Sequence, residues 1–348
     1  MTTSTESTAR VSQTSVPRIG AEAELPLVSF VIPVRNDAVR LSGCLTTIRA
    51  NTYPAARVEI VVADNGSIDD SAATARASGA RVIDLPGLSV AALRNTAAAE
   101  AKGDVLAFVD ADHEIDPAWI ASAVENLRDA SVAMTGALCL PPRGQTWVQR
   151  MYDGLRGRTV GRGDVEWLGS GNMAVRRRDF ERVGGFDESL ETCEDVDLCQ
   201  RLRATGSRIV GDDRLKNVHL GDPATLGGLF RGELWRGRDN LRVSLRTTIT
   251  PRALPGILFP VFSLVCLLLA VLNLLAVPFL GPIALFGAAG MLAIPFALAA
   301  LRALRIIANA RLASPLDWGR AYAVAVTYDA ARTLALLMRA RHHRPRQR

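Results

Sequence analysis

Four residues that could act together in chemistry lie within a stretch of five, directly after an apolar run. They are Asp110, Asp112, His113 and Glu114, and the apolar run is Val105–Val109. Such a run is typical of a strand buried on both faces of a parallel sheet. Ligands bind at the carboxyl ends of these strands in open α/β sheets. Carboxylates crowded there repel one another unless a cation joins them, and their oxygen atoms suit Mg2+ or Mn2+.

The same composition also fits an acidic, solvated turn between a strand and a helix. A D-x-D pattern alone is a weak motif. Asp116 and Pro117 follow it and predict the start of a helix that carries Trp119 and Ile120. The rest of the chain has to decide between a metal site and a solvated turn.

Further strands and helices alternate along the chain, with short loops between them. Apolar runs predict strands at Leu27–Val34, Val58–Ala63, Arg81–Leu85, Val105–Val109, Val132–Leu140, Gly169–Val175 and Ser207–Val210. Ser67 and Asp179 are expected to cap the helices that follow them. Residues Pro141–Glu166 are rich in Gly and Arg and are expected to form a mobile loop. The alternation implies a parallel sheet covered by helices on both faces.

Composition narrows the class of protein. The formal net charge is +6, but basic and aromatic residues do not interleave, so we expect no nucleic-acid partner. The five cysteines are scattered without zinc-site spacing, which indicates reduced thiols in the cytosol. Residues 1–24 are rich in Thr, Ser and Ala and have no apolar core of a signal peptide, so we expect a disordered lead-in.

No charged residue occurs between Ala253 and Leu301. Gly256–Leu301 is long enough for two membrane-spanning helices of about 20 residues each, joined near Pro278–Pro282. Arginines flank this stretch on both sides: Arg231, Arg236, Arg238, Arg242, Arg246, Arg252, Arg302, Arg305 and Arg311. The positive-inside rule then predicts a multi-pass protein of the cell (plasma or inner) membrane with its N-terminal α/β domain in the cytosol.

The last part of the chain is also apolar but carries charge. Ala321–Met338 contains Asp329 and Arg332, so it is either an interfacial helix or a third span with a paired charge, and we expect the former. The basic tail His342–Arg348 suits anionic lipid headgroups. Membrane lipids are therefore expected partners.

With these strands, helices and polar turns in this order, the chain resembles the family 2 glycosyltransferases, which have the GT-A fold. The matching stretches are Ile32–Asp37, Ala63–Asp70, Arg94–Asn95, Gly103–Asp112, Gly184–Glu188 and Glu194–Leu198. Each is weak alone, but all six in the family's order form a specific signal. The fold class implied is α/β: a GT-A catalytic domain with a Rossmann-like, mostly parallel sheet, followed by C-terminal transmembrane or interfacial helices.

The resemblance implies a nucleotide-sugar donor. The donor-binding residues would be Pro33, Arg35, Asp37, Asp64, Arg94 and Asp110. Asp64 would accept a hydrogen bond from the base, commonly uracil, although it also fits an Asx turn. The family often has an aromatic residue at the position of Arg35, whose guanidinium plane can also stack on a base. Arg94 would contact the base or the diphosphate, or is simply an exposed charge on an Ala-rich helix.

By the same resemblance, Asp112 binds the metal directly and Asp110 faces the ribose or the sugar. His219 is the expected third ligand because many relatives carry a His at this distance after the ED motif; a hydrogen-bonded structural role is the alternative. His113 is adjacent, but alternation along an extended chain would point it away from Asp112. The implied cofactor is Mg2+ or Mn2+, which bridges the diphosphate.

Asp195 matches the family's catalytic base, with Glu194 beside it. It would take the proton from an acceptor hydroxyl, and attack opposite the leaving nucleotide would invert the anomeric centre. The competing interpretation is that both acids merely cap a helix start.

We therefore expect inverting, metal-dependent transfer of one sugar from a nucleotide sugar, such as a UDP-sugar, to a lipid-linked or cell-envelope glycan acceptor. Transfer to polyprenyl phosphate is the alternative, and a non-catalytic nucleotide-binding membrane adaptor is a further one. The expected organisation is a disordered segment 1–24, a GT-A domain 25–230, a basic juxtamembrane linker 231–255, a transmembrane hairpin 256–301 and a cytosolic or interfacial helix with a basic tail 302–348.

Overall fold

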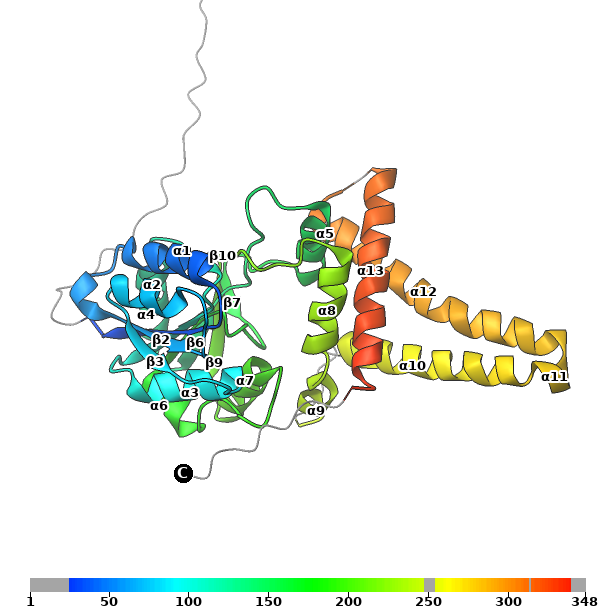
Figure 1. Ribbon diagram of the computed structural model, residues 1–348, viewed down its shortest axis with the longest axis horizontal. Helices are drawn as coiled ribbons and strands as arrows, with labels where there is room; N and C mark the ends of the chain where they lie inside the picture. Colours follow the sequence, from blue (N-terminus) through cyan, green and yellow to red (C-terminus); the bar gives the residue numbers. More distant parts are fainter. Residues whose placement is uncertain (1–24, 247–253, 313, 339–348) are drawn as a thin grey trace, which may run out of the picture.

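The computed structural model describes residues 25–246, 254–312 and 314–338 (Figure 1). The segment 1–24, expected to be disordered, and the basic tail His342–Arg348 lie outside these residues. An α/β domain forms one end of the molecule, and a long helical hairpin projects from the other (Figure 1). Shorter helices lie between the two parts.

An eight-stranded sheet forms the centre of the α/β domain, in the order β3-β2-β1-β4-β8-β6-β9-β7. Its strands are β1 Val28–Val34, β2 Val58–Asp64, β3 Arg81–Asp84, β4 Val105–Val109, β6 Val132–Gly136, β7 Arg162–Asp164, β8 Asn172–Arg176 and β9 Arg208–Asp212. Strand β1 pairs in parallel with β2 and β4. Strand β8 lies antiparallel between β4 and β6, and β7 is antiparallel to β9. The expected mostly parallel α/β sheet is confirmed, with antiparallel strands in its second half.

Helices cover both faces of the sheet, which explains why its central strands are apolar throughout. One face packs on α1 Ala38–Arg49, α2 Ser71–Ala77 and α4 Trp119–Leu127. The other packs on α3 Val90–Glu100, α6 Arg177–Arg182 and α7 Glu194–Ala204. In β1, Phe30 and Ile32 enter the first core, whereas Val31 enters the second. A 3-10 turn, η2 Ala55–Arg57, precedes β2.

A small second sheet stands beside the main one. It pairs β5 His113–Ile115 with β10 Asn217–His219 in antiparallel fashion, with His113 opposite His219. The backbone N–H of Leu220 donates to the carbonyl of Asp112 at 2.9 Å. This pairing brings two distant parts of the chain to the end of β4.

The segment Pro141–Glu166 is not the mobile loop that its composition suggested. It contains α5 Trp147–Arg156, whose start has a capping box made by Thr146 and Gln149, and it also contains β7. The buried face of α5 carries Val148, Met151, Tyr152 and Leu155. Its apolar periodicity was obscured by the surrounding Gly and Arg residues.

Two predicted helix caps are also wrong. Helix α2 begins at Ser71 rather than after Ser67, and the Ser67 side chain instead bonds to Asp64. Asp179 lies inside the first turn of α6, where it pairs with Arg176 at 2.8 Å.

The remaining helices form the part from which the hairpin extends. They are α8 Leu226–Arg236, α9 Asn240–Ser244, α10 Leu254–Leu275, α11 Val277–Leu280, α12 Pro282–Ala310 and α13 Pro315–Ala335. Helices α10 and α12 run side by side, with α11 at the far tip, and α13 lies along α8 (Figure 1). Helix α8 passes through residue 230, where the sequence placed the end of the catalytic domain.

Helices α10 and α12 are, among the described residues, two helices long and apolar enough to cross a membrane by length and composition. The charged residues of the last helix are paired rather than free. Asp329 of α13 bonds to Arg302 of α12 at 2.8 Å, and Arg332 bonds to Glu233 of α8 at 2.8 Å. These ion pairs tie α13 to both neighbours.

Candidate active site

The D-x-D segment lies where β4 ends. All five residues of β4 are buried, and the chain then turns so that the N–H of His113 donates to the carbonyl of Asp110 at 3.1 Å. Strand β8 runs alongside, and Gly171, just before it, faces this turn. The sequence interpretation of a buried strand followed by a polar turn therefore matches the structure.

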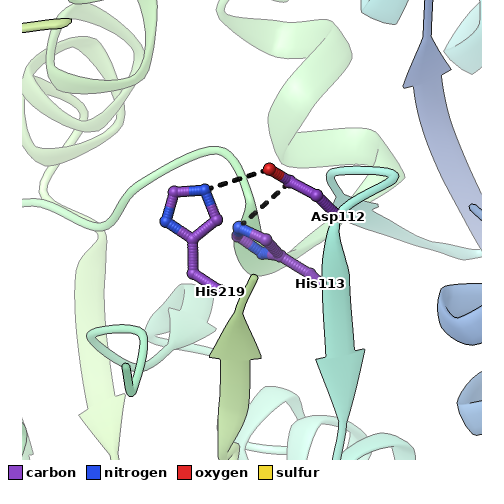
Figure 2. Close-up of side chains that lie close together, drawn as sticks. All are labelled: Asp112, His113 and His219. Atoms are coloured by element: carbon purple, nitrogen blue, oxygen red, sulfur yellow. Dashed lines mark ion pairs between the residues drawn. The ribbon is translucent and has the colours of Figure 1, made fainter. Parts of the chain in front are cut away.

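Asp112, His113 and His219 point towards one another (Figure 2). Their ligand atoms lie within 4.8 Å of one another. His219 Nε2 is 3.2 Å from Asp112 Oδ2, and His113 Nε2 is 3.7 Å from Asp112 Oδ1. The expectation that His113 points away is wrong because residues 110–112 form a turn, where strand alternation does not apply.

The second nitrogen of each imidazole has a partner that leaves Nε2 facing Asp112. His219 Nδ1 lies 2.8 Å from Asp222 Oδ1, and His113 Nδ1 lies 2.5 Å from the carbonyl of Gly171. Metal-binding histidines usually donate their other N–H to a carboxylate or a carbonyl, because this fixes the tautomer and the ring orientation. The Asp112 carboxylate and the two Nε2 atoms are therefore ligands that fit a small divalent cation.

Opposite charges hold His219 and Asp112 together. Burial lowers the pKa of His219, but its bonds to Asp112 and Asp222 outweigh this and raise that pKa to about 9. Burial raises the pKa of Asp112, but the hydrogen bond and charge of His219 hold it well below its usual range. Burial lowers the pKa of His113, and the charge of His219 adds to this effect. A cation between Asp112 and His219 would take the place of the proton on Nε2.

Two glycines leave room for this cluster. A Cβ added to Gly171 would lie 2.8 Å from Asp110 Oδ2 and would press on the His113 ring. A Cβ added to Gly221 would collide with the Asp112 carboxylate and would lie 3.0 Å from His219 Nε2. Larger residues at either position would displace the side chains that face one another.

Arg94 is not the exposed helix charge that one interpretation allowed. It is only 2% exposed and bonds to Asp110 Oδ1 at 2.6 Å and to Glu194 Oε1 at 2.7 Å. Burial lowers the pKa of Arg94, but these two carboxylates raise it above its usual value. Arg94 thus links the D-x-D turn to the start of α7. The side-chain amide of the adjacent Asn95 donates to the carbonyl of Phe186 at 2.8 Å and accepts from its N–H at 2.9 Å.

Asp195 lies in the first turn of α7. Its carboxylate accepts hydrogen bonds from the N–H of Val196 at 2.7 Å and of Ser170 at 3.3 Å. The N-cap position itself is Cys193, in a left-handed conformation with φ of 61°. Burial, together with the charge of Glu194, raises the pKa of Asp195 to about 7. A carboxyl group that titrates near neutral pH suits proton transfer better than simple capping.

The other expected donor-binding residues lie at the ends of β1 and β2, the same edge of the sheet. Asp64 is 4% exposed and accepts from the N–H and Oγ of Ser67, at 3.1 and 2.5 Å, so its side chain closes the turn after β2. Pro33 pairs with Ala63 in the strand register, and Arg35 is exposed. Asp37 is held by Arg40, which also approaches Asp112 at 3.7 Å.

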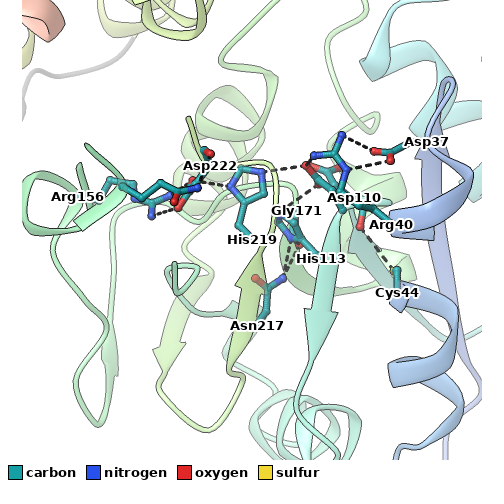
Figure 3. Close-up of polar contacts among 12 residues, drawn as sticks. Asp37, Arg40, Cys44, Asp110, His113, Arg156, Gly171, Asn217, His219 and Asp222 are labelled. Atoms are coloured by element: carbon teal, nitrogen blue, oxygen red, sulfur yellow. Dashed lines mark hydrogen bonds and ion pairs between the residues drawn. The ribbon is translucent and has the colours of Figure 1, made fainter. Parts of the chain in front are cut away.

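Several residues at the site were not identified from the sequence. They are Arg40, Arg156, Ser170, Gly171, Gly221 and Asp222. Asp222 could have been found, because it follows His219 by three residues. Arg156 could not, since it comes from α5, a helix that the sequence did not predict. Figure 3 shows Arg156, Asp222 and His219 in one row leading to the D-x-D turn.

Comparison with known proteins agrees with this fold. Residues 29–184, which carry β1 to β8 and the D-x-D turn, match the model of glycosyl transferase family 2. The structure of the mannosyltransferase PcManGT from Pyrobaculum calidifontis has a similar fold, with a TM-score of 0.57 at 20% identity over 92% of this chain and 91% of that one. The family match and the fold together make this protein a glycosyltransferase with a GT-A-like fold. The segment that belongs to glycosyl transferase family 2 is residues 29–184.

Curated relatives are similar over part of the chain. Glycosyltransferase AglE of Haloferax volcanii is 27% identical over 244 residues, which is 66% of this chain and 77% of the relative. A pre-mycofactocin glycosyltransferase of Mycobacterium tuberculosis is 29% identical over 196 residues, which is 52% of this chain and 40% of the relative. The chain therefore spans well under half of the second relative's length.

Proposed function

We propose that this glycosyltransferase moves a single sugar from a nucleotide-sugar donor, such as a UDP-sugar, to a lipid-linked or cell-envelope glycan acceptor, with inversion and with Mg2+ or Mn2+. The observation that carries the proposal is the convergence of Asp112 and His219, with Asp222 behind the imidazole. The mannosyltransferase PcManGT, whose fold is similar, forms a complex with GDP-Man and Mn2+, which supports a metal-dependent nucleotide-sugar reaction.

Asp112 and His219 would hold the metal, and His113 is a further candidate ligand. When bound, Mg2+ or Mn2+ supplies positive charge that offsets the charge developing on the departing diphosphate. Arg94 holds Asp110 in place beside this position, so that Asp110 can face the ribose or the sugar. Asp64, Pro33, Arg35 and Asp37 would bind the nucleoside at the ends of β1 and β2.

Asp195 would act as the base towards the acceptor hydroxyl. Its raised pKa of about 7 means that it can both accept a proton and release it near neutral pH. Glu194 is bonded to Arg94 and Ser170, so it sets the electrostatic environment of Asp195. Attack by the acceptor oxygen opposite the nucleotide gives inversion.

We further propose that α10 and α12 cross the cell membrane, with the catalytic domain in the cytosol and α13 at the lipid interface. Large apolar side chains are exposed along the hairpin, including Phe262, Leu272, Phe279 and Phe286. Exposed apolar surface of this extent marks an interaction site rather than a water-facing surface. Membrane lipids are the partner that fits two helices of this length.

Polyprenyl phosphate is the second candidate acceptor. Helix α12 of the apolar hairpin packs on α5, so a lipid-borne phosphate could approach the site from the side of the hairpin. Such an acceptor oxygen is already ionised, and Asp195 would then matter less. A non-catalytic adaptor has no physical reason to retain both Asp112 and Asp195 in the observed arrangement.

The direct test is nucleotide release and product analysis with the full chain in detergent. A panel of UDP- and GDP-sugars, each with Mn2+ or with a chelator, is offered together with lipid-linked glycan or polyprenyl phosphate acceptors. We expect metal-dependent release of nucleoside diphosphate with one donor and a product of inverted configuration. Binding of that donor should lose its metal enhancement in Asp112→Ala. Release that is unaffected by chelator would contradict the metal role.

A further inference from the structure

The carboxylate of Asp222 lies behind His219 and has no exposed side-chain surface. It accepts from His219 Nδ1 at 2.8 Å and from the two terminal nitrogens of Arg156 at 2.8 and 2.5 Å (Figure 3). A bidentate arginine–carboxylate pair fixes the plane of the carboxylate. The direction in which His219 presents Nε2 to Asp112 therefore depends on Arg156.

Arg156 is in turn held by the helical part of the molecule. It occupies the last turn of α5, and its guanidinium lies over the Tyr152 ring at 4.8 Å from the centroid. The Tyr152 hydroxyl donates to Glu233 of α8 at 2.6 Å. Glu233 also accepts from Arg332 of α13 at 2.8 Å.

Helix α5 also packs very closely on α12, two residues before Arg156. Asn309 Nδ2 of α12 donates to the carbonyl of Gly154 at 2.9 Å. A Cβ added to Gly154 would lie 2.9 Å from the backbone oxygen of Ile306 and 3.2 Å from Ala310 Cβ. Only a glycine permits this approach, so the hairpin and the end of α5 are fitted to each other.

We propose that Asp222 and Arg156 are positioning residues for His219, and that α12 holds this pair in place by packing on Gly154. The inference rests on the proposed metal role of Asp112 and His219. It connects a membrane helix to the metal site through one short helix. The metal affinity of the site thereby depends on how the hairpin packs on α5.

A purely structural role for the same residues makes a different prediction. A buried ion pair that only supported the fold would change stability and leave the metal affinity of the folded protein unchanged. A positioning role changes the metal affinity of protein that is still folded. The two roles separate when the melting temperature and the Mn2+ affinity are measured on the same sample.

The first experiment titrates the full chain, in detergent and without nucleotide, with Mn2+ and follows free Mn2+ by electron paramagnetic resonance. We expect Asp222→Asn and Arg156→Gln each to weaken Mn2+ binding by about 10- to 100-fold, the usual effect of losing a partner behind a metal-binding histidine. Arg156→Lys should restore binding only in part, because an ammonium cannot pair in bidentate fashion. The double variant Asp222→Asn, Arg156→Met leaves no unpaired buried charge. Its Mn2+ affinity is measured in place of that of any single variant that fails to fold.

Folded variants that bind Mn2+ as tightly as the wild type would overturn the inference and leave the proposed function intact. A wild-type chain that binds no Mn2+ would instead overturn the metal site itself, and this inference with it.

The second experiment tests the connection to α12. Gly154→Ala should weaken Mn2+ binding, whereas Gly290→Ala on α12, where a Cβ meets nothing within 4 Å, should not. When Gly154→Ala is combined with Asp222→Asn, the Mn2+ affinity should fall little further, because both changes act on His219 through Asp222. Equal affinities for Gly154→Ala and Gly290→Ala, or fully additive losses in the combined variant, would contradict the connection.

Discussion

At the scale of single residues, the carboxylates of the site differ in the partners that surround them. Asp110 is neutralised by Arg94, and Asp112 faces His219. Burial and the charge of Glu194 raise the pKa of Asp195, and they outweigh the opposing charge of Arg94. Carboxylates whose surroundings push their pKa values apart can take different chemical roles. This contrast supports a binding role for Asp112 and a proton-transfer role for Asp195.

Asp195→Asn tests the base directly. The amide preserves shape but cannot take a proton, so turnover should fall by about 10²- to 10⁴-fold while nucleotide affinity persists. Asp164→Asn, on the exposed strand β7, is the matched control and should leave both unchanged. Steady-state kinetics and donor calorimetry measure the two quantities. Near wild-type turnover would refute the base role, and a mild loss would favour a phosphate acceptor.

The raised pKa of Asp195 predicts a pH dependence with a definite sign. Below about pH 7 the carboxyl group is protonated in the free enzyme and cannot act as a base. Values of kcat/KM should therefore rise with pH up to about 7 and level off above it, and this step should be absent in Asp195→Asn. A profile that falls across this range, or the same step in the variant, would contradict the assignment.

At the scale of elements, the sequence predicted most of what local patterns determine. The buried strand Val105–Val109, the acidic turn after it and the helix at Glu194 were all recognisable. The antiparallel insertion of β8 and the pairing of β5 with β10 depend on contacts between distant segments, so no local pattern reveals them. That pairing is what brings His113 and His219 to Asp112.

The turn after β10 offers a test at this scale. Gly221→Ala places a Cβ against the Asp112 carboxylate, so Mn2+ affinity and turnover should both fall by at least about 10-fold, as for other disturbed metal ligands. Gly163→Ala, where a Cβ meets nothing within 4 Å, is the control and should behave as the wild type. Mn2+ titration of both variants measures the effect. Unchanged affinity in Gly221→Ala would mean that the metal lies elsewhere.

At the scale of the whole molecule, the hairpin has the dimensions of a membrane anchor. The 22 residues of α10 span about 33 Å as a helix, close to the roughly 30 Å of a bilayer's hydrocarbon core. The tip of the hairpin carries no charge, whereas arginines follow it at Arg302, Arg305 and Arg311. By the positive-inside rule, the tip should face outward and the α/β domain should remain in the cytosol with its nucleotide-sugar donor.

Cysteine labelling of intact cells with a membrane-impermeant reagent tests this arrangement. Single cysteines are introduced in place of Phe279 at the hairpin tip, Val39 on α1 and Leu337 beyond α13, each of which is well exposed, after replacement of the native cysteines. Only the Phe279 position should be labelled in intact cells, and all three should be labelled after permeabilisation. Labelling of Val39 or Leu337 in intact cells would place the catalytic domain or the end of α13 outside. Protection of all three would instead indicate a hairpin that enters the bilayer without crossing it, because the uncharged tip would then remain in the hydrocarbon.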